Sequence, residues 1–301
     1  MNALQILLAH SIDYAGLFPP AELAMDAALD NYARYVNGPS SWALGRFIVP
    51  ASRLAELEAG LGRTPGREIG RPWRVAALVG TDVAADLRLL EAFNGRTGAQ
   101  ATIDTIEVKA TSERDIDEIA RLVPASFQTY IEIPIEADPG SLIAVIGHRG
   151  HRAKVRTGGI TRNAFPQTAD LLRFLRETVR LQVPFKATAG LHHPLRAVYR
   201  LTYAEQSPSG IMFGFLNLLL AVAFLQAGME QTEVAGVLEE GDPGAFQVDD
   251  SGISWRGNRL SSTALSAARR LGMNSFGSCS FTEPLADLAA LQLLPSTVSL
   301  A

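Results

Sequence analysis

The sequence has one cysteine, few lysines and no strong excess of charge of either sign. Its 301 residues include 27 basic and 31 acidic side chains, a net charge of −4, so we expect neither nucleic acid nor a membrane as a partner. The single cysteine excludes an internal disulfide framework and is typical of a reducing compartment. The first residues lack the basic region and the clear cleavage site of a secretory signal. We therefore expect a cytoplasmic protein.

Lysine is scarce even among the basic residues. Three of the 27 are lysines, at positions 109, 154 and 186, and the other 24 are arginines. Arginine stays protonated in a protein, whereas a desolvated lysine can lose its proton and become a nucleophile. Because arginine supplies positive charge everywhere else, Lys109, Lys154 and Lys186 are candidates for a chemical role.

Apolar residues are plentiful, at 47%, and they are arranged in a repeating pattern that excludes a disordered chain. Short apolar runs, each followed by a longer amphipathic stretch, start 24 to 31 residues apart. The runs are 46–50 (RFIVP), 74–80 (RVAALVG), 105–110 (TIEVKA), 129–135 (TYIEIPI), 153–159 (AKVRTGG) and 184–190 (PFKATAG). With an earlier strand near 7–13 and a last one at 275–280 (SFGSCS), eight strands alternate with helices. This pattern predicts a single α/β domain over residues 1–301, a parallel (β/α)8 TIM barrel.

The regular spacing is broken once. From position 184 to position 275 is 91 residues, so we expect a large insertion at about 191–273 that covers the barrel mouth or forms an oligomer contact. Its most apolar stretch, 211–227, is predicted to be a buried helix or the contact of a homo-oligomer. The segment 246–255 (FQVDDSGISW) is predicted to form a β-hairpin.

Strand alternation places charged side chains inside the predicted barrel. Side chains two residues apart share a face of a strand, and the apolar ones face the helices. The residues left on the inner faces are Thr105, Glu107 and Lys109, then Tyr130, Glu132 and Pro134, then Lys154 and Arg156, then Lys186 and Thr188. All three lysines are therefore expected inside, where catalytic groups gather at the carboxyl ends of the strands. The alternative is a set of lysine–glutamate pairs within a packed barrel, since buried charges need partners.

This set of residues indicates chemistry on a carbonyl group. Clustered cations and partial burial lower the pKa of a lysine, and a neutral lysine can attack a carbonyl carbon to form a Schiff base. A nearby carboxylate such as Glu107 can hold a water molecule and move protons during dehydration and carbon–carbon cleavage. The combination is typical of a class I aldolase, a lyase that acts on a small carbonyl compound.

Short motifs along the chain resemble those of the deoxyribose-phosphate aldolase family, (β/α)8 enzymes that act through a Schiff base. Residues 154–158 (KVRTG) resemble the family's K-T-S-T-G on strand six, and residues 185–190 (FKATAG) resemble its F-K-x-A-G-G on strand seven. Residues 276–280 (FGSCS) resemble its F-G-A-S-S on strand eight. The family's strand-four aspartate falls on Glu107, and 12–14 with 46–54 (RFIVPASRL) resemble its first two strands.

The resemblance implies a role for each matching residue. Lys154 is the expected Schiff-base lysine, Lys186 the cation that lowers its pKa, and Glu107 the carboxylate that relays protons. The positions that match the family's phosphate-binding loops are Gly158, Gly190 and Ser280.

The chain departs from the family at Arg156, Ala189 and Cys279. Arg156 replaces a small residue beside the expected nucleophile and suits a carboxylate or phosphate held by two hydrogen bonds. It can equally be a structural partner of Glu107 or Glu132. We therefore expect an anionic small-molecule carbonyl substrate, without assigning deoxyribose phosphate itself.

Further candidate binding residues lie at other strand ends: Lys109, Glu132, Thr188, His192 and Asp13. His192 and His193 directly follow the seventh strand, and neighbours on an extended chain point opposite ways. We therefore expect at most one of them to face the site, as a general acid or base or as a metal ligand, or else both to be a loop or surface pair.

Three other functions compete with the aldolase hypothesis, which itself requires no cofactor and no metal. A phosphoribosyltransferase-like or other anion-binding barrel would grip phosphates or carboxylates noncovalently with the lysines and Arg156. A metal-dependent lyase or isomerase would use His192 or His193 with Glu107 and Glu132. A non-catalytic binding barrel would keep all these charges paired internally.

Overall fold

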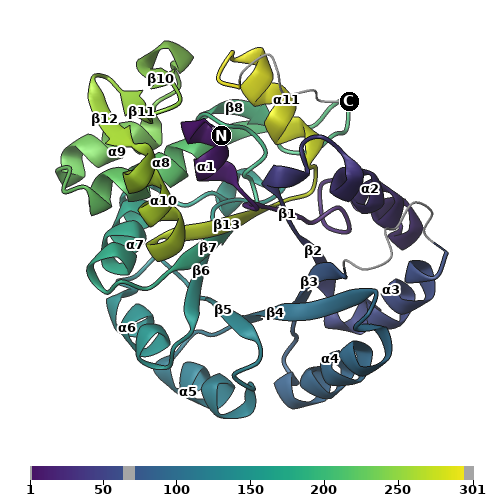
Figure 1. The fold of residues 1–301 in the computed structure, drawn as a ribbon. Helices are drawn as coiled ribbons and strands as arrows, with labels where there is room; N and C mark the ends of the chain where they lie inside the picture. Colours follow the sequence, from purple (N-terminus) through teal and green to yellow (C-terminus); the bar gives the residue numbers. More distant parts are fainter. Residues whose placement is uncertain (1, 64–71, 295–301) are drawn as a thin grey trace.

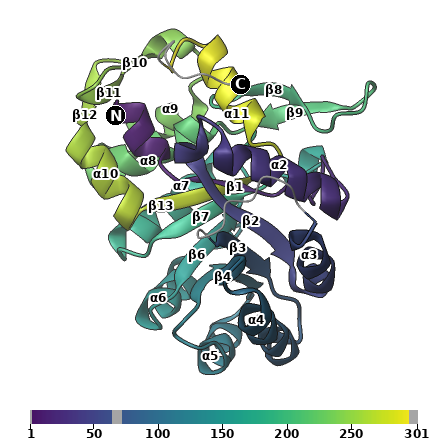
Figure 2. The same cartoon turned by 45° about the vertical axis from the view of Figure 1, so that its right-hand side comes forward.

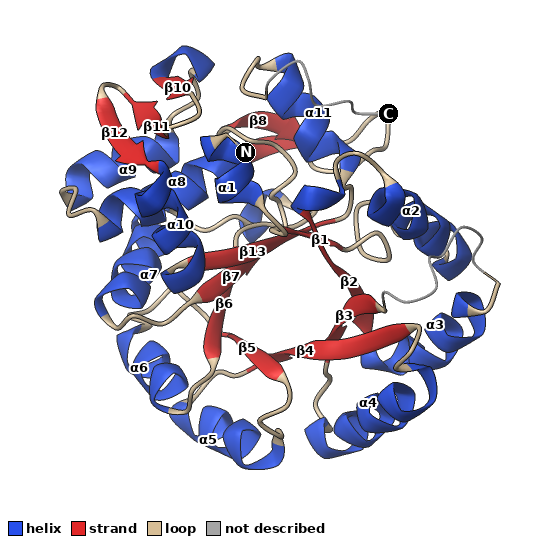
Figure 3. Ribbon diagram, viewed as in Figure 1, coloured by secondary structure: helices blue, strands red, loops and turns tan. Residues whose placement is uncertain are grey.

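The structure, a computed structural model, describes residues 2–63 and 72–294 of the chain. Its parallel strands close into an eight-stranded barrel ringed by helices, which confirms the predicted (β/α)8 fold (Figures 1 and 3). In hydrogen-bonding order the strands are β1 (Ile12–Tyr14), β13 (Met273–Ser278), β7 (Phe185–Thr188), β6 (Arg152–Arg156), β5 (Gln128–Glu132), β4 (Ala101–Lys109), β3 (Trp73–Leu78) and β2 (Leu44–Pro50).

The helices of the outer layer alternate with the barrel strands along most of the chain. They are α2 (Met25–Asn37), α3 (Leu54–Leu61), α4 (Val83–Thr97), α5 (Glu113–Leu122), α6 (Gly140–His148), α7 (Thr168–Arg180), α8 (Phe215–Gln226), α10 (Ser262–Leu271) and α11 (Thr282–Ala290). Short 3-10 helices lie at Ser41–Ala43, Ala51–Arg53, Arg162–Ala164 and Pro243–Ala245.

Helix α5 shows why these segments pack as they do. Ser112 and Asp115 form a reciprocal capping box that satisfies the first backbone N–H groups, and Ile116 and Ile119 bury one stripe of the helix. The outward-facing strand residues, such as Ile106 on β4, are buried beneath this layer. Inward positions are thereby left to the polar side chains.

The first strand differs from the prediction of a strand near 7–13. Leu7 and Leu8 end a short helix, α1 (Ala3–Leu8), and the strand β1 begins later, at Ile12. Asn2 and Gln5 form a capping box, and the apolar residues of α1 are buried at helical spacing, which favours a helix over a strand.

The insertion after β7 forms two small antiparallel sheets outside the barrel. Its first part is an antiparallel hairpin, β8 (Ala197–Arg200) and β9 (Ser209–Met212), which projects from the barrel (Figure 2). After α8 and α9 (Gln231–Glu239) come β10 (Phe246–Val248), β11 (Gly252–Trp255) and β12 (Asn258–Ser261). The hairpin predicted at 246–255 is therefore confirmed, and β12 extends it to a three-stranded antiparallel sheet.

The apolar stretch 211–227 divides into two elements. It starts at the end of β9 and continues as α8, in which every residue from Phe215 to Phe224 is buried. The segment is a core helix that packs against α7, α9, α10 and β13, so the oligomer contact considered for it has no apolar helical face to use. Within residues 2–63 and 72–294, no helix combines the length and hydrophobicity needed to span a bilayer.

Candidate active site

Five charged side chains predicted to be functional meet inside the barrel. Asp13 comes from β1, Glu107 from β4, Glu132 from β5, Lys154 from β6 and Lys186 from β7. Lys154 is in register with Lys186 on one side and with Glu132 on the other. Neighbouring strands therefore hold these residues at the same height along the barrel axis. Because their side chains all point inward, they meet there.

The five side chains form a continuous series of ion pairs with alternating sign. Lys186 Nζ lies 2.6 Å from both Asp13 Oδ2 and Glu107 Oε1. Lys154 Nζ lies 2.7 Å from Glu107 Oε2 and 2.8 Å from Glu132 Oε2. Glu107 thus accepts from both lysines through its two separate oxygens. Charged groups this deeply buried are stable when paired in this way.

The neighbouring charges determine the protonation of this series. Burial raises the pKa of Glu107, but the ammonium groups of Lys154 and Lys186 outweigh it and lower the pKa to about 2. Burial lowers the pKa of Lys186, but Asp13 and Glu107 outweigh it and hold the pKa above its ordinary value. At Lys186 the expected lowering by clustered cations is therefore wrong, because carboxylates lie between and beside the cations. Lys186 remains a fixed positive charge.

The two buried lysines differ in their access to solvent space. A cavity of about 750 Å³ opens at the carboxyl ends of the strands, and Lys154, Glu107 and Glu132 line it. Lys186 is fully buried and, like Asp13, does not line the cavity. Of the two, Lys154 is therefore the amine that a bound molecule can reach.

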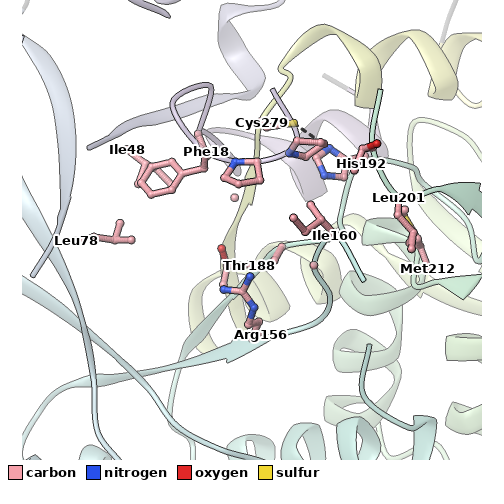
Figure 4. Close-up of a pocket in the computed structure, with 18 of the residues that line it drawn as sticks. Phe18, Ile48, Leu78, Arg156, Ile160, Thr188, His192, Leu201, Met212 and Cys279 are labelled. Atoms are coloured by element: carbon pink, nitrogen blue, oxygen red, sulfur yellow. Dashed lines mark hydrogen bonds between the residues drawn. The ribbon is translucent and has the colours of Figure 1, made fainter. Parts of the chain in front are cut away.

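Three other predicted residues lie on the cavity wall nearer its opening. Thr188 and Arg156 point into the space in Figure 4. The Arg156 Nε–H donates to the carbonyl oxygen of Gly158 at 3.1 Å, and the guanidinium forms no ion pair with Glu107 or Glu132. Lys109 is 77% exposed and lies 3.6 Å from Glu132 Oε1. Arg156 thus brings an exposed positive charge to the cavity, close enough to Glu132 to help lower the pKa of that carboxyl without pairing with it.

The residues expected to bind phosphate do not form one open loop. The ring of Phe165 packs against Gly158 and Gly190, and a Cβ on these glycines would lie 2.4 and 2.8 Å from its Cε1. Gly190, with φ of +75°, borders the cavity, whereas Gly158 and Ser280 do not. Ser280 Oγ instead accepts the Glu283 N–H at 3.1 Å, beside the start of α11. The resemblance to phosphate-binding loops is therefore not matched by the packing here.

A second polar group, centred on His192, lies on another part of the cavity wall. His192 Nδ1 is 3.3 Å from Ser278 Oγ, 3.7 Å from Cys279 Sγ and 3.6 Å from Glu283 Oε2. The Tyr203 hydroxyl donates to Glu283 at 3.0 Å and lies 3.4 Å from Cys279 Sγ. Sequence patterns did not indicate Tyr203 or Glu283. Tyr203 lies between β8 and β9 and Glu283 lies in α11, so their contact joins segments that are far apart in the sequence.

Burial keeps His192 and Cys279, the two central residues of this second group, uncharged. Burial, with a smaller effect of His193, lowers the pKa of His192 to about 4, and burial raises the pKa of the Cys279 thiol to about 11. A neutral imidazole beside a neutral thiol is not the thiolate–imidazolium pair of a cysteine nucleophile. These groups are better suited to hydrogen bonding with a ligand.

Both neighbouring histidines border the cavity, so the expectation of at most one is wrong. They follow β7 in a loop, not in an extended strand, and their rings need not alternate. His193 stacks on Tyr199 at 3.6 Å and pairs with Asp287 at 2.5 Å, which joins the hairpin to α11. In the described part of the chain no three His, Cys, Asp or Glu side chains are placed to hold a metal ion.

Comparison of the chain with protein-family models, with curated proteins and with solved structures found no match. The site must therefore be interpreted from its own geometry. That geometry is a reachable buried amine, two ionised carboxylates beside it, and a fixed second cation behind them.

Proposed function

We propose that the protein is a carbon–carbon lyase of class I aldolase type that forms a Schiff base between Lys154 and a small anionic carbonyl compound. The observation that carries the proposal is the position of Lys154, which is buried between Glu107 and Glu132 yet lines a cavity of about 750 Å³. A volume of this size is typical of small-molecule sites. The barrel fold is compatible with an enzyme whose chemistry lies at this end.

The two carboxylates are suited to different tasks. Glu107 faces two ammonium groups and remains ionised, so it anchors Lys154 and Lys186. Glu132 faces Lys154 and the exposed Lys109, and it loses its closest cation when Lys154 gives up a proton. Both carboxylates border the cavity, so this difference in neighbouring charge decides the assignment: proton transfer to Glu132, and electrostatic support to Glu107, for which the resemblance implied the proton relay.

The proposed steps balance with these groups alone. Glu132 takes a proton from the Lys154 ammonium, and the free amine adds to the carbonyl carbon with transfer of a proton to its oxygen. Return of the proton from Glu132 releases that oxygen as water and leaves a positively charged iminium. A carboxylate then removes the proton of the substrate's β-hydroxyl, the carbon–carbon bond breaks, and its electron pair forms an enamine. Because the iminium carries the same charge as the ammonium, Glu107 stabilises both.

Reductive trapping tests this proposal directly. Incubation with a panel of aldehydes and oxo acids in the presence of sodium borohydride is expected to add one reduced substrate to Lys154. The small number of lysines makes the assignment by peptide mass mapping unambiguous. Lys154→Arg, which keeps the positive charge between the glutamates, should abolish the adduct. Retention of full turnover in Lys154→Arg, or an adduct at Lys186 instead, would show that the proposal is wrong.

A noncovalent anion-binding enzyme is the second candidate. Lys109, Arg156 and Arg200 border the cavity, which favours an anionic ligand in either case. This candidate predicts tight binding of phosphates or carboxylates with no reductive trapping. The same experiment therefore separates the two.

A further inference from the structure

The cavity beside Lys154 is walled mainly by hydrocarbon. Phe18, Ile48 and Leu78 lie on one side, and Leu201 and Met212 of the insertion lie on the other (Figure 4). Ile160 lies between these two sides, next to the Arg156 and Thr188 side chains. The hydroxyl groups of a sugar would need polar partners along both walls, whereas an aromatic or branched aliphatic group would be desolvated favourably there.

Arg156 supplies a charged contact close to the reacting amine. It lies two residues after Lys154 on β6, so the two side chains leave the same face of the strand about 6.6 Å apart. In residues 2–63 and 72–294 no carboxylate is recorded within ion-pair distance of its guanidinium. A substrate carboxylate bound at Arg156 would therefore lie on a carbon next to the carbonyl carbon that reacts with Lys154.

The packing of Phe165 argues against a phosphorylated substrate. Its ring contacts Gly158 and Gly190 at the positions where the sequence motifs predict a phosphate loop. Ser280, the third predicted phosphate contact, lies outside the cavity lining. Arg156, two residues after Lys154 and on the cavity wall, instead presents a planar guanidinium that matches the fork of one carboxylate.

From these features we infer that the substrate is a 4-hydroxy-2-oxo acid whose chain beyond the hydroxyl is apolar, bound with its carboxylate at Arg156 and its carbonyl carbon at Lys154. The inference rests on the proposed Schiff-base function and specifies its substrate class. In the covalent step the Lys154 nitrogen bonds to carbon 2, and the 2-oxo oxygen leaves as water. The apolar side chain lies between the two hydrocarbon walls, and the ionised carboxylate stays bound throughout.

Four carbonyl compounds test the inference. The quantity compared is the concentration of each compound at which half of Lys154 is labelled in the presence of sodium borohydride. Phenylpyruvate is expected to label at the lowest concentration. Phenylacetone, which has a methyl in place of the carboxylate, and pyruvate, which lacks the ring, should each require about 10- to 100-fold more. Glyceraldehyde 3-phosphate should label worst. Labelling by glyceraldehyde 3-phosphate at the lowest concentration would overturn the inference and leave the proposed function intact.

Variants locate the two contacts. Arg156→Gln should raise the half-labelling concentration of phenylpyruvate about 10- to 100-fold and leave that of phenylacetone unchanged. Arg88→Gln, the same change of charge on the exposed face of α4, is the control and should alter neither. Ile160→Asp, at an exposed wall position, should weaken labelling by phenylpyruvate more than labelling by pyruvate. Equal effects of Arg156→Gln on phenylpyruvate and phenylacetone would contradict a carboxylate contact.

Binding of 3-phenyllactate, measured by calorimetry, needs no imine. It therefore tests the substrate class separately from the Schiff-base function. It should bind the wild-type protein and bind Arg156→Gln about 10- to 100-fold more weakly. If it fails to bind while a carbonyl compound still labels Lys154, the substrate class is wrong and the lyase proposal stands. If no carbonyl compound labels Lys154, the lyase proposal is wrong and the assignment of an oxo acid falls with it.

Discussion

Charged side chains lie toward both ends of the barrel. At the carboxyl end some of them border a cavity, whereas those toward the amino end pair with one another and do not line it. At the carboxyl end, Lys154 and its two glutamates border a cavity of about 750 Å³. Toward the amino end, Asp104 pairs with Arg46 at 2.5 Å and with Arg74 at 2.9 Å, and none of these residues lines that cavity. Charge inside the barrel is therefore not enough to mark a site, because the adjoining space decides what the charge can meet.

Tyr130 on β5 lies between the two regions. Its ring is 5.6 Å from Lys186 Nζ, while its hydroxyl donates to Asn274 at 3.2 Å and accepts from Arg152 at 3.3 Å. The loops that follow the strands and the β8–β9 hairpin extend the walls at the carboxyl end. Charged residues at the carboxyl end thus border a cavity, whereas those toward the amino end do not line it.

The largest expected difference between the two ends is in activity. Lys154 and Arg152 leave the same face of β6, two residues apart, one beside the cavity and one bonded to Asn274 at 2.6 Å. Lys154→Met should abolish reductive labelling and lower turnover roughly 1,000-fold or more, because the nucleophile is lost. Arg152→Met should lower turnover less than about 10-fold. Turnover and labelling of folded protein measure both, and equal losses would contradict the division between the ends.

The next difference is in stability. Glu107→Leu leaves Lys154 and Lys186 buried with one carboxylate each, and it should lower the free energy of unfolding by about 3–5 kcal/mol. Asp104→Leu removes the pairs of a carboxylate that is 32% exposed, one with the largely buried Arg46 and one with the exposed Arg74, and it should cost only about 1–2 kcal/mol. Urea unfolding at neutral pH measures both values. A cost for Asp104→Leu as large as that for Glu107→Leu would show that burial does not distinguish the two clusters.

The third difference is in how stability depends on pH. Between pH 6.5 and 4, His192 on the cavity wall should make the free energy of unfolding depend on pH more strongly than the Asp104 cluster does. Burial holds its pKa at about 4, below the ordinary value of 6.5, so below pH 6.5 the unfolded chain binds a proton that the folded chain does not. Stability should therefore fall as the pH drops from 6.5 toward 4. His192→Gln should reduce this fall by up to about 3 kcal/mol at pH 4, measured by urea unfolding at a series of pH values. An unchanged pH profile in the variant would indicate that His192 is not held neutral.

The sequence predicts the charged series better than it predicts the space around it. Two-residue alternation places Glu107, Lys154 and Lys186 inward without any knowledge of neighbours, because the barrel fold requires the alternate residues to face the helices. The packing of Phe165 on two glycines, and of Tyr203 against Cys279, depends on how loops fold onto strands. No local periodicity encodes such contacts between distant segments.

Asp13 illustrates the same limit inside the barrel. The sequence indicates Asp13 only as a candidate binding residue at a strand end, yet it is a direct partner of Lys186 and also accepts from Ser275 Oγ at 2.8 Å. Strand β1 has only three residues, Ile12–Tyr14, too few for alternation to be read from sequence. Closure of the barrel between β1 and β13, a tertiary event, brings Asp13 to its partners.

The smallest expected effect belongs to Lys109, the lysine at the rim of the same cavity. It is 77% exposed and 3.6 Å from Glu132, so solvent screens its charge on both the glutamate and a ligand. Lys109→Met should change the free energy of unfolding by less than about 1 kcal/mol and the half-labelling concentration of phenylpyruvate less than about threefold. Arg156→Gln, measured in parallel, should shift that concentration at least about 10-fold, because its guanidinium forms no ion pair with a carboxylate of the described residues. A larger effect of Lys109→Met than of Arg156→Gln would mean that the anionic group binds at the rim, away from the buried amine.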